Sequence, residues 1–235
     1  MKAVIVRTWR IFASAVAIAV LALVLVEGWF VARVLWWNGH NPATTSFMEH
    51  SLATLRAKNP KAKLQQTWVP YNRISVHLKR AVIAAEDAKF TQHEGFDWEG
   101  IQVAIEKNQR YGKPIAGGST ISQQLAKNLF LSGERSIVRK AQEAAITLML
   151  EMVMSKQRIL EIYLNVVEWG NGVYGAEAAA RHYFGVSAAA LTEEQSARLA
   201  AMLPRPRYYD YYRDSSYLAD YSDRILARMP DAQLP

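Results

Sequence analysis

Apolar residues recur at helical spacing along most of the chain after residue 74. Leu78, Ala81 and Val82, for example, lie three and four positions apart, as on the buried face of a helix. This spacing predicts helices over residues 75–89, 98–109, 119–130, 136–154, 156–167, 173–184, 192–203 and 215–228. No stretch alternates with a period of two for long enough to predict a sheet. The predicted fold class is therefore all-α.

Residues at the ends of these segments and inside them refine the prediction. Ser136 and Ser155 can cap the helices that they precede. Thr192 and Gln195 have the spacing of a capping box. Residues 144–154 are apolar nearly all round, so we expect this helix to run through the core.

The longest apolar run lies near the N-terminus. Residues 11–26 carry no charge, and a helix over about residues 9–32 would be long enough to cross a bilayer, which needs roughly 20 residues. A cleaved signal peptide is the alternative, but small residues at the cleavage positions are absent, which favours a retained anchor. Lys2, Arg7 and Arg10 precede the run and favour a cytoplasmic N-terminus, with the rest of the chain exported.

The 235 residues, 51% of them apolar, leave room for one domain of ordinary size behind this helix. We expect a cytoplasmic tip and transmembrane anchor in residues 1–37, a juxtamembrane connector in residues 38–72 and a catalytic domain in residues 73–235. The connector contains three prolines and is mixed in composition, so we expect it to pack loosely.

Charge and cysteine content narrow the compartment and the partners. The chain has no cysteine, which suits an oxidising compartment without requiring one. Its formal net charge of +7 would suit nucleic acid, anionic lipid or a phosphorylated substrate. Behind a membrane anchor nucleic acid is the least favoured of the three, and we expect no nucleic-acid partner.

Ionisable residues are densest in residues 86–97, which hold four acids, a histidine and two phenylalanines directly after an apolar helix pattern. Glu86 lies one turn beyond Val82, at the edge of the buried face, so its carboxylate must reach water or find polar partners. Two interpretations stay open at this point: a solvated helix end, or a catalytic carboxylate.

A glycine-led helix start follows at residues 117–120 (Gly-Gly-Ser-Thr). Glycines let the backbone approach a ligand closely, and a helix N-terminus can hold an anion. Four cations come next along the chain, at Lys127, Arg135, Arg139 and Lys140. They suit a departing pyrophosphate, which needs charge stabilisation rather than a proton. The alternatives are a capped helix with a solvated polar face, and an ordinary ion pair between Arg139 and Glu143.

Five sequence blocks resemble those of one enzyme family. They are EDAKFTQHEGFD at residues 86–97, GGSTISQQLAKNLFL at 117–131, RKAQE at 139–143, KQRILEIYLN at 156–165 and EWGNGVYGAEAAARHYFG at 168–185. In order and spacing they are similar to the monofunctional biosynthetic peptidoglycan glycosyltransferases, the family 51 transglycosylases that also form the first domain of bifunctional penicillin-binding proteins. The resemblance covers about residues 68–207, with Ser122 where threonine is more usual.

The resemblance implies a lysozyme-like helical head with a smaller membrane-apposed lobe, which polymerises lipid II into glycan strands with inversion and releases undecaprenyl pyrophosphate. It implies that Glu86 takes the proton from the acceptor hydroxyl and that Glu143 is the second essential carboxylate. A divalent cation, magnesium or manganese, is allowed beside Glu143 but not required. The positions that match donor-sugar and pyrophosphate contacts are Ser119, Gln123, Gln124, Lys127, Arg135 and Arg139.

The same resemblance implies a single-pass protein of the bacterial inner membrane, with its catalytic domain on the periplasmic side. Its partners would be lipid II, the growing lipid-linked strand and the membrane, and proteins of cell division or elongation are further candidates.

Several residues of these blocks have simpler interpretations. His93 has no second histidine at metal-ligand spacing, so a structural hydrogen bond is favoured over a metal site. Asp87 and Asp97 could cap helices or order the loop, and Glu168 is expected to be structural. Two other functions stay open, a lysozyme-like enzyme that cleaves glycan and an anchored scaffold. The cations argue against the first, because a glycosidase needs an acid where they would stand.

Overall fold

The structure is a computed structural model that describes residues 2–112, 117–134 and 136–235. It divides into two compact units, Met1–His40 and Asn41–Pro235. The first unit is one helix, and the second contains the remaining elements.

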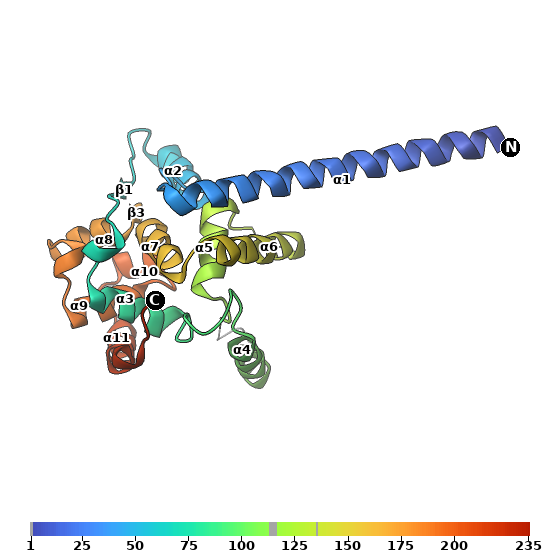
Figure 1. Ribbon diagram of the computed structural model, residues 1–235. Helices are drawn as coiled ribbons and strands as arrows, with labels where there is room; N and C mark the ends of the chain where they lie inside the picture. The colour runs from blue at the N-terminus through green and yellow to red at the C-terminus, as the bar shows by residue number, and fades with distance from the viewer. Residues whose placement is uncertain (1, 113–116, 135) are drawn as a thin grey trace. The chain divides into compact units, whose positions relative to one another are not determined.

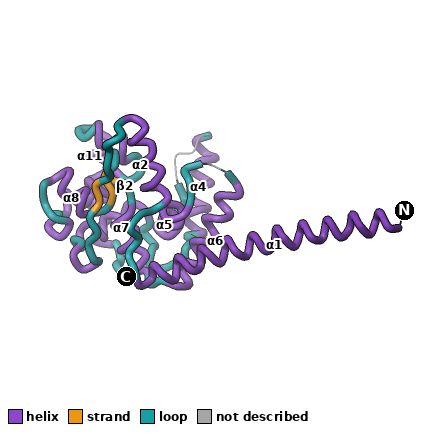
Figure 2. The backbone as a smooth tube through the Cα atoms, turned by 90° about the horizontal axis from the view of Figure 1, so that it is seen from above, coloured by secondary structure: helices purple, strands orange, loops and turns teal. Residues whose placement is uncertain are grey.

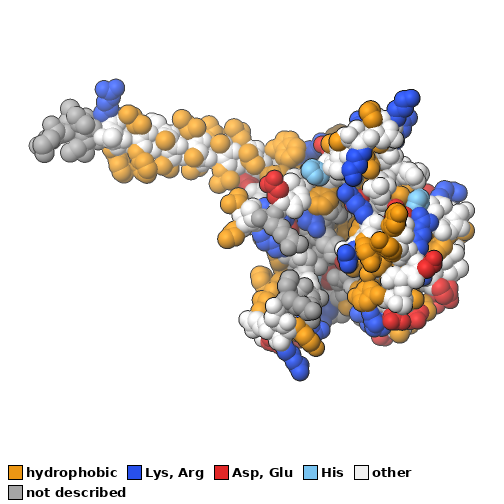
Figure 3. Space-filling model, turned by 180° about the vertical axis from the view of Figure 1, so that it is seen from behind, with side chains coloured by type: hydrophobic (Ala, Val, Ile, Leu, Met, Phe, Trp, Pro, Cys, Tyr) orange, Lys and Arg blue, Asp and Glu red, His pale blue; other side chains and the backbone are white. Residues whose placement is uncertain are grey.

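The first unit is α1 (Lys2–Gly39), within which Arg7–Gly39 has a mean hydropathy of 2.5 and is long enough to cross a membrane. Hydrophobic side chains cover it along its length (Figure 3). The Arg33 guanidinium lies 4.4 Å from the centre of the Trp37 ring and 5.7 Å from that of Trp29. A cation over tryptophan rings suits the interface at one end of a span. The predicted apolar helix is confirmed, and it extends beyond residue 32.

The second unit is helical (Figure 1). Its α-helices are α2 (Ser46–Lys58), α3 (Val76–Glu86), α4 (Trp98–Tyr111), α5 (Ile121–Phe130), α6 (Ile137–Val153), α7 (Lys156–Val166), α8 (Ala176–Phe184), α9 (Glu193–Met202), α10 (Pro206–Tyr211) and α11 (Ser216–Arg228). Short 3₁₀ turns are η1 (Tyr71–Arg73), η2 (Ala188–Ala190) and η3 (Met229–Asp231). The predicted all-α class is confirmed.

Three very short strands interrupt the helices (Figure 2). They are β1 (Gln65–Gln66), β2 (Glu168–Gly170) and β3 (Val173–Tyr174), in the order β1-β3-β2. β1 pairs with β3 in parallel, and β2 pairs with β3 in antiparallel. Strands of two or three residues show no detectable alternation, which is why the sequence did not predict them. The helix predicted from residue 173 begins instead at Ala176, after the β3 pairing.

Side-chain caps fix where most helices begin. Ser136 and Ser155 accept hydrogen bonds from backbone amides of α6 and α7, as predicted. The capping box of Thr192 and Gln195 is also present. Four further side chains cap helices by accepting a hydrogen bond from a backbone amide: Thr45, Ser75, Asp97 and Thr120.

Two groups of helices make up the core. α3 packs against α9 and α11, and these two also pack against each other. α5 packs against α2, α6 and α7. Phe90, Tyr163 and Trp169 are fully buried. The end of α3 and the start of α5 therefore come together between the two groups.

Two expectations about packing are wrong. The helix at residues 144–154 does not run through the core: Ile146 and Leu150 are buried, but Leu148 and Met152 are exposed because α5 and α7 cover only one side of α6. The connector is not loosely packed either. α2 packs on α5, and the backbone of Val69 exchanges two hydrogen bonds of 2.9 Å with the side chain of Asn165.

Candidate active site

Glu86 is the last residue of α3, and it lines a cavity of about 160 Å³. Asp87, Ser119 and Thr120 line the same cavity from the loop after α3 and from the start of α5, and Arg228 reaches it from the end of α11. The helix ends at this point because residue 87 leaves helical geometry, with φ −162°. The edge of the apolar face thus opens onto a polar hollow.

Gln124 of α5 positions the Glu86 carboxylate. Its side-chain Nε2 donates a hydrogen bond of 2.7 Å to Glu86 Oε2. The buried hydroxyl of Tyr163 on α7 donates a hydrogen bond of 2.9 Å to Gln124 Oε1. Because Tyr163 occupies the amide oxygen, the NH₂ group of Gln124 is directed toward Glu86. Three helices therefore hold one carboxylate in place.

Burial raises the pKa of Glu86, and the negative charge of Asp87 raises it further. The hydrogen bond from Gln124 and the charge of Lys127 act in the opposite direction without cancelling the rise. A carboxylate with a raised pKa is a stronger proton acceptor once it is ionised. The environment therefore suits a general base.

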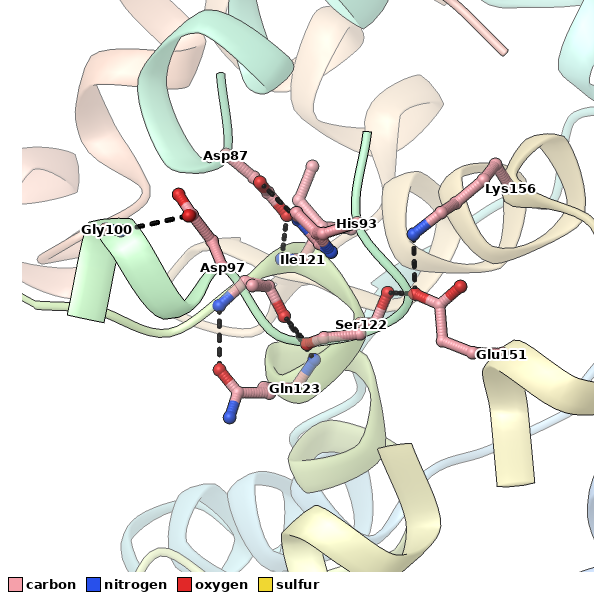
Figure 4. Close-up of polar contacts among 11 residues, drawn as sticks. Asp87, His93, Asp97, Gly100, Ile121, Ser122, Gln123, Glu151 and Lys156 are labelled. Atoms are coloured by element: carbon pink, nitrogen blue, oxygen red, sulfur yellow. Dashed lines mark hydrogen bonds and ion pairs between the residues drawn. The ribbon is translucent and has the colours of Figure 1, made fainter. Parts of the chain in front are cut away.

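Asp87 joins the loop after α3 to the start of α5 (Figure 4). One oxygen accepts a hydrogen bond of 3.0 Å from the backbone amide of Ile121, and the other lies 2.9 Å from His93 Nε2. The structural hydrogen bond predicted for His93 is confirmed. Asp97 caps α4, since its Oδ1 accepts from the amide of Gly100 at 2.9 Å.

A second polar cluster supports the same loop from the other side (Figure 4). Glu151 of α6 accepts a hydrogen bond from the Ser122 hydroxyl and forms an ion pair of 2.8 Å with Lys156. The ammonium of Lys156 also lies 4.7 Å from the centre of the Phe90 ring. Glu151 thus connects α5, α6 and α7, and Lys156 extends this contact to the loop that follows Glu86.

Glu143 has a different environment from Glu86. Its side chain is 3% exposed and pairs with Arg139 Nη1 at 2.7 Å and with the ammonium of Lys140. The Arg139–Glu143 ion pair allowed by the spacing is therefore present, but it is largely buried. Two cations are directed to the acid from the first turns of α6.

Lys127 is coupled to both acids. Glu143 and Glu86 each interact with its charge. Burial lowers the pKa of Lys127, and the nearby Arg139 and Lys140 lower it further. Lys127 and Gln124 also line a second cavity, of about 250 Å³, together with Phe47, Glu168 and Pro204. Lys127 therefore lines a hollow and interacts electrostatically with both carboxylates.

A base, a capped helix start and a set of cations thus meet in a chain whose sequence matches the transglycosylase family over residues 51–230. The chain belongs to the transglycosylase family. A relative from Dechloromonas aromatica (strain RCB) is 64% identical over 207 residues, which are 88% of this chain and 90% of the relative. A relative from Janthinobacterium sp. (strain Marseille) is 60% identical over 220 residues, 94% and 95% of the two chains.

A third relative, from Nitrosospira multiformis, is 58% identical over 227 residues, 97% of each chain. All three are named biosynthetic peptidoglycan transglycosylase. The family inferred from the five sequence blocks is confirmed, and with it the conclusion that this chain is a glycosyltransferase.

The three other predicted binding residues differ in their surroundings. Ser119 is exposed and lines the cavity beside Glu86. Gln123 is buried, and its Oε1 accepts a hydrogen bond of 3.0 Å from the Thr120 amide in a capping box, so this oxygen already has a partner. Arg135 lies outside the described residues.

The donor set does not fit a resident metal ion. No group of three or more His, Cys, Asp or Glu within the described residues could hold one. The acid considered for this role, Glu143, already pairs with two cations.

Three residues around the site were not predicted to take part. Tyr163 orients Gln124, Arg228 reaches the Glu86 cavity, and Glu168 lines the cavity of Lys127. Glu168 accepts a hydrogen bond of 2.8 Å from Arg207 Nε, and burial raises the pKa of Glu168. For Tyr163 a signal existed, because a tyrosine on an apolar helix face needs a polar partner.

Proposed function

We propose that this transglycosylase polymerises lipid II into the glycan strands of peptidoglycan. The observation that carries the proposal is Glu86, which lines a cavity, has a raised pKa and interacts electrostatically with Lys127. The names of the three relatives support peptidoglycan as the product. A base and a cationic leaving-group site are the two functions that the transfer of a sugar from a pyrophosphate requires.

In the proposed reaction, Glu86 takes the proton from the 4-hydroxyl of the acceptor sugar. The hydroxyl oxygen forms a bond to the anomeric carbon of the lipid-linked donor strand, with inversion. The bond from that carbon to the pyrophosphate oxygen breaks, and the electron pair leaves with undecaprenyl pyrophosphate. The leaving group needs no proton, because its charge can be stabilised by cations.

We assign this stabilisation to Lys127, Arg139 and Arg135. Glu143 would position Arg139 and Lys140 for the diphosphate, in keeping with its two ion pairs. Ser119, Gln123 and Gln124 would contact the donor sugar. For Gln124 the proposal adds a second role, since its amide already donates to Glu86.

We further propose the division of the chain into a cytoplasmic tip and anchor in residues 1–37, a connector in residues 38–72 and a catalytic domain in residues 73–235. The anchor would lie in the inner membrane and the catalytic domain on its periplasmic side, in keeping with the cations before the apolar run. A reporter fused after Pro235 should then be active only outside the cytoplasm. Activity on the cytoplasmic side would contradict both the topology and the proposed substrate.

The deciding experiment supplies the purified full-length protein with lipid II in detergent. We expect a ladder of lipid-linked glycan that grows with time. If the protein instead releases soluble fragments from preformed glycan, the alternative of a lysozyme-like hydrolase is correct. If the protein neither forms polymer nor releases fragments, and Glu86→Gln behaves as the parent in every assay, the proposal that Glu86 is a catalytic base fails.

A further inference from the structure

Tyrosine is concentrated near the C-terminal end of the chain. Of the 11 tyrosines, six lie within residues 208–221: Tyr208, Tyr209, Tyr211, Tyr212, Tyr217 and Tyr221. Four of the six are exposed, with Tyr208 at 40%, Tyr212 at 52%, Tyr217 at 58% and Tyr211 at 84%. Large aromatic side chains gathered at a surface commonly mark a binding site. None of them has a part in the reaction proposed above.

The exposed rings form a continuous surface with Tyr221. Tyr208 lies 4.7 Å from Tyr212, Tyr212 lies 5.3 Å from Tyr211, and Tyr217 lies 6.1 Å from Tyr221, between ring centres. Tyr208, Tyr217 and Tyr221 line a cavity of about 290 Å³. Tyr208, Tyr211 and Tyr212 line a second hollow, of about 480 Å³. Tyr208 joins the two, and we call these five residues the tyrosine surface.

The helix that carries two rings of the tyrosine surface ends beside the cavity of Glu86. Tyr217 and Tyr221 lie on α11, and the last residue of α11, Arg228, lines that cavity. Burial raises the pKa of Tyr221, and the charge of Glu86 raises it further. Pro204 lines both the tyrosine cavity and the cavity of Lys127. The tyrosine surface thus adjoins the cavity of Lys127 through Pro204 and is joined to the cavity of Glu86 through α11.

Cations accompany the rings. The Arg205 guanidinium lies 4.2 Å from the centre of the Tyr208 ring, and that of Arg224 lies 5.5 Å from Tyr221. Within the part of the chain that the structure describes, neither arginine has a carboxylate within 4 Å, whereas Arg213 pairs with Asp210 at 2.9 Å. Arg205 and Arg224 can therefore accept a carboxylate from a ligand.

This combination fits a saccharide with acidic substituents. Flat phenol rings offer rigid contact area to the apolar face of a sugar, and their hydroxyls can bond to its hydroxyl and amide groups. Arginines beside the rings suit the carboxylates of peptide stems on alternate sugars. A long protein partner would fit less well, because two hollows joined through one tyrosine form a path rather than a broad patch.

We propose that the tyrosine surface binds the saccharide of the growing glycan strand, several sugar units away from the bond being formed. This inference rests on the proposed function and adds to it a site that keeps the strand on the enzyme between transfers. A strand that stays bound is extended again instead of being released, so the site favours long products.

The test uses the full-length double variant Tyr212→Ser/Tyr217→Ser, which changes one exposed ring in each hollow. Binding of lipid-free, uncrosslinked glycan strands should weaken about tenfold, and mean product length should fall. The initial rate of joining two lipid II molecules should stay at the parent value. Tyr212→Trp/Tyr217→Trp keeps flat rings and should restore both binding and length. Tyr111→Ser, at a residue with 59% exposure on α4, is the matched control and should change neither.

The outcomes separate this inference from the function on which it rests. Parental glycan affinity and product length in the serine double variant would overturn the inference. So would an equal loss of the initial coupling rate in a folded variant, because the rings would then belong to the reaction centre. If the unmodified protein makes no polymer but binds soluble glycan through these tyrosines, the proposed function fails and the binding site remains.

Discussion

Glu86 at the end of α3 accepts a hydrogen bond from a neutral amide, whereas Glu143 on α6 is paired with an arginine and a lysine. Burial raises the pKa of Glu86, so its negative charge is disfavoured in the folded protein. Glu143 is 3% exposed, yet its charge is matched by two cations. One acid is therefore suited to take a proton, and the other to hold positive charge in place.

The comparison shows how one site can use the same side chain for two purposes. A base needs a proton affinity near the working pH, which burial without a cationic partner provides. An acid that organises arginine and lysine needs direct contact with both, which the two ion pairs of Glu143 provide. Lys127, coupled to both acids, is where the two environments meet.

The largest effect is expected from Glu86→Gln, which keeps size and polarity but cannot accept the proton. Polymerisation of lipid II should fall by about 100-fold or more, while binding of lipid II persists. The measurement is the initial rate of polymer formation beside a binding assay. Glu194→Gln, at an exposed acid on α9, is the control and should keep the parent rate. Near-parental elongation by Glu86→Gln would remove this residue from the mechanism.

The raised pKa also fixes the sign of a stability change. Unfolded glutamate titrates near 4.3, and folded Glu86 titrates higher, so between these values the folded state binds more protons. The free energy of unfolding therefore falls as the pH rises through this window. Glu86→Gln removes that loss, and its melting temperature at pH 7 should equal or exceed that of the parent. A clear decrease would show that the Glu86 charge is stabilising.

Glu143→Gln should have the second largest effect on activity. For its stability the comparison predicts a loss, in contrast to Glu86→Gln. Removing the acid leaves Arg139 and Lys140 without their partner, and breaking a buried ion pair is destabilising. We expect a loss of roughly 2 kcal/mol, less than for a fully buried pair because Lys140 is half exposed, and polymerisation lower on the order of 30-fold. Thermal unfolding at pH 7 checks the first value. A variant as stable as Glu86→Gln would mean that the two acids are equivalent.

The sequence predicted the helices on which the two acids lie, because helix periodicity and short-range caps are local signals. The spacing of Leu78, Ala81 and Val82 put Glu86 at the edge of a buried face, and the structure shows it at the rim of a cavity. Ser136 likewise predicted the start of α6, and the i, i+4 spacing of Arg139 and Glu143 allowed the ion pair that is present. These features depend on residues three or four positions apart.

Other features depend on pairs that are far apart in the chain. The hydrogen bond from Tyr163 to Gln124 spans 39 positions, and Arg228 of α11 lines the same cavity as Glu86. Periodicity places Tyr163 on a buried face but does not identify its partner. The exposed side of α6 was missed for a related reason, since an apolar sequence does not show which face its neighbours leave uncovered.

Lys127→Ala gives the next effect in size, and it sharpens the comparison through pH. The Lys127 charge lowers the pKa of Glu86, so without it this pKa should rise and the acid limb of the pH–rate profile should move to higher pH. Loss of charge beside the leaving group should also reduce polymerisation about tenfold. Lys61→Ala, at an exposed lysine, is the control. A tenfold loss with an unmoved acid limb would place Lys127 at the pyrophosphate alone.

The smallest effect is expected from Tyr163→Phe, which tests how Glu86 is positioned. Burial raises the pKa of Tyr163 well above its ordinary value, and the charges of Glu86 and Asp87 add to this, so its hydroxyl stays protonated and donates to Gln124 at any working pH. Phenylalanine leaves the amide free to rotate and present its oxygen to the carboxylate. One lost hydrogen bond is worth about 1 kcal/mol, so polymerisation should fall a few-fold.

A double-mutant cycle with Gln124→Ala separates positioning from packing in the Tyr163 variant. If Tyr163 acts through the amide, Tyr163→Phe should have no further effect on the rate once Gln124 is alanine. Gln124→Ala alone should also raise the pKa of Glu86, because the hydrogen bond from Gln124 lowers it. Its acid limb should therefore move to higher pH, as in Lys127→Ala. Additive losses in the double variant would show that the tyrosine hydroxyl acts on the site by another route.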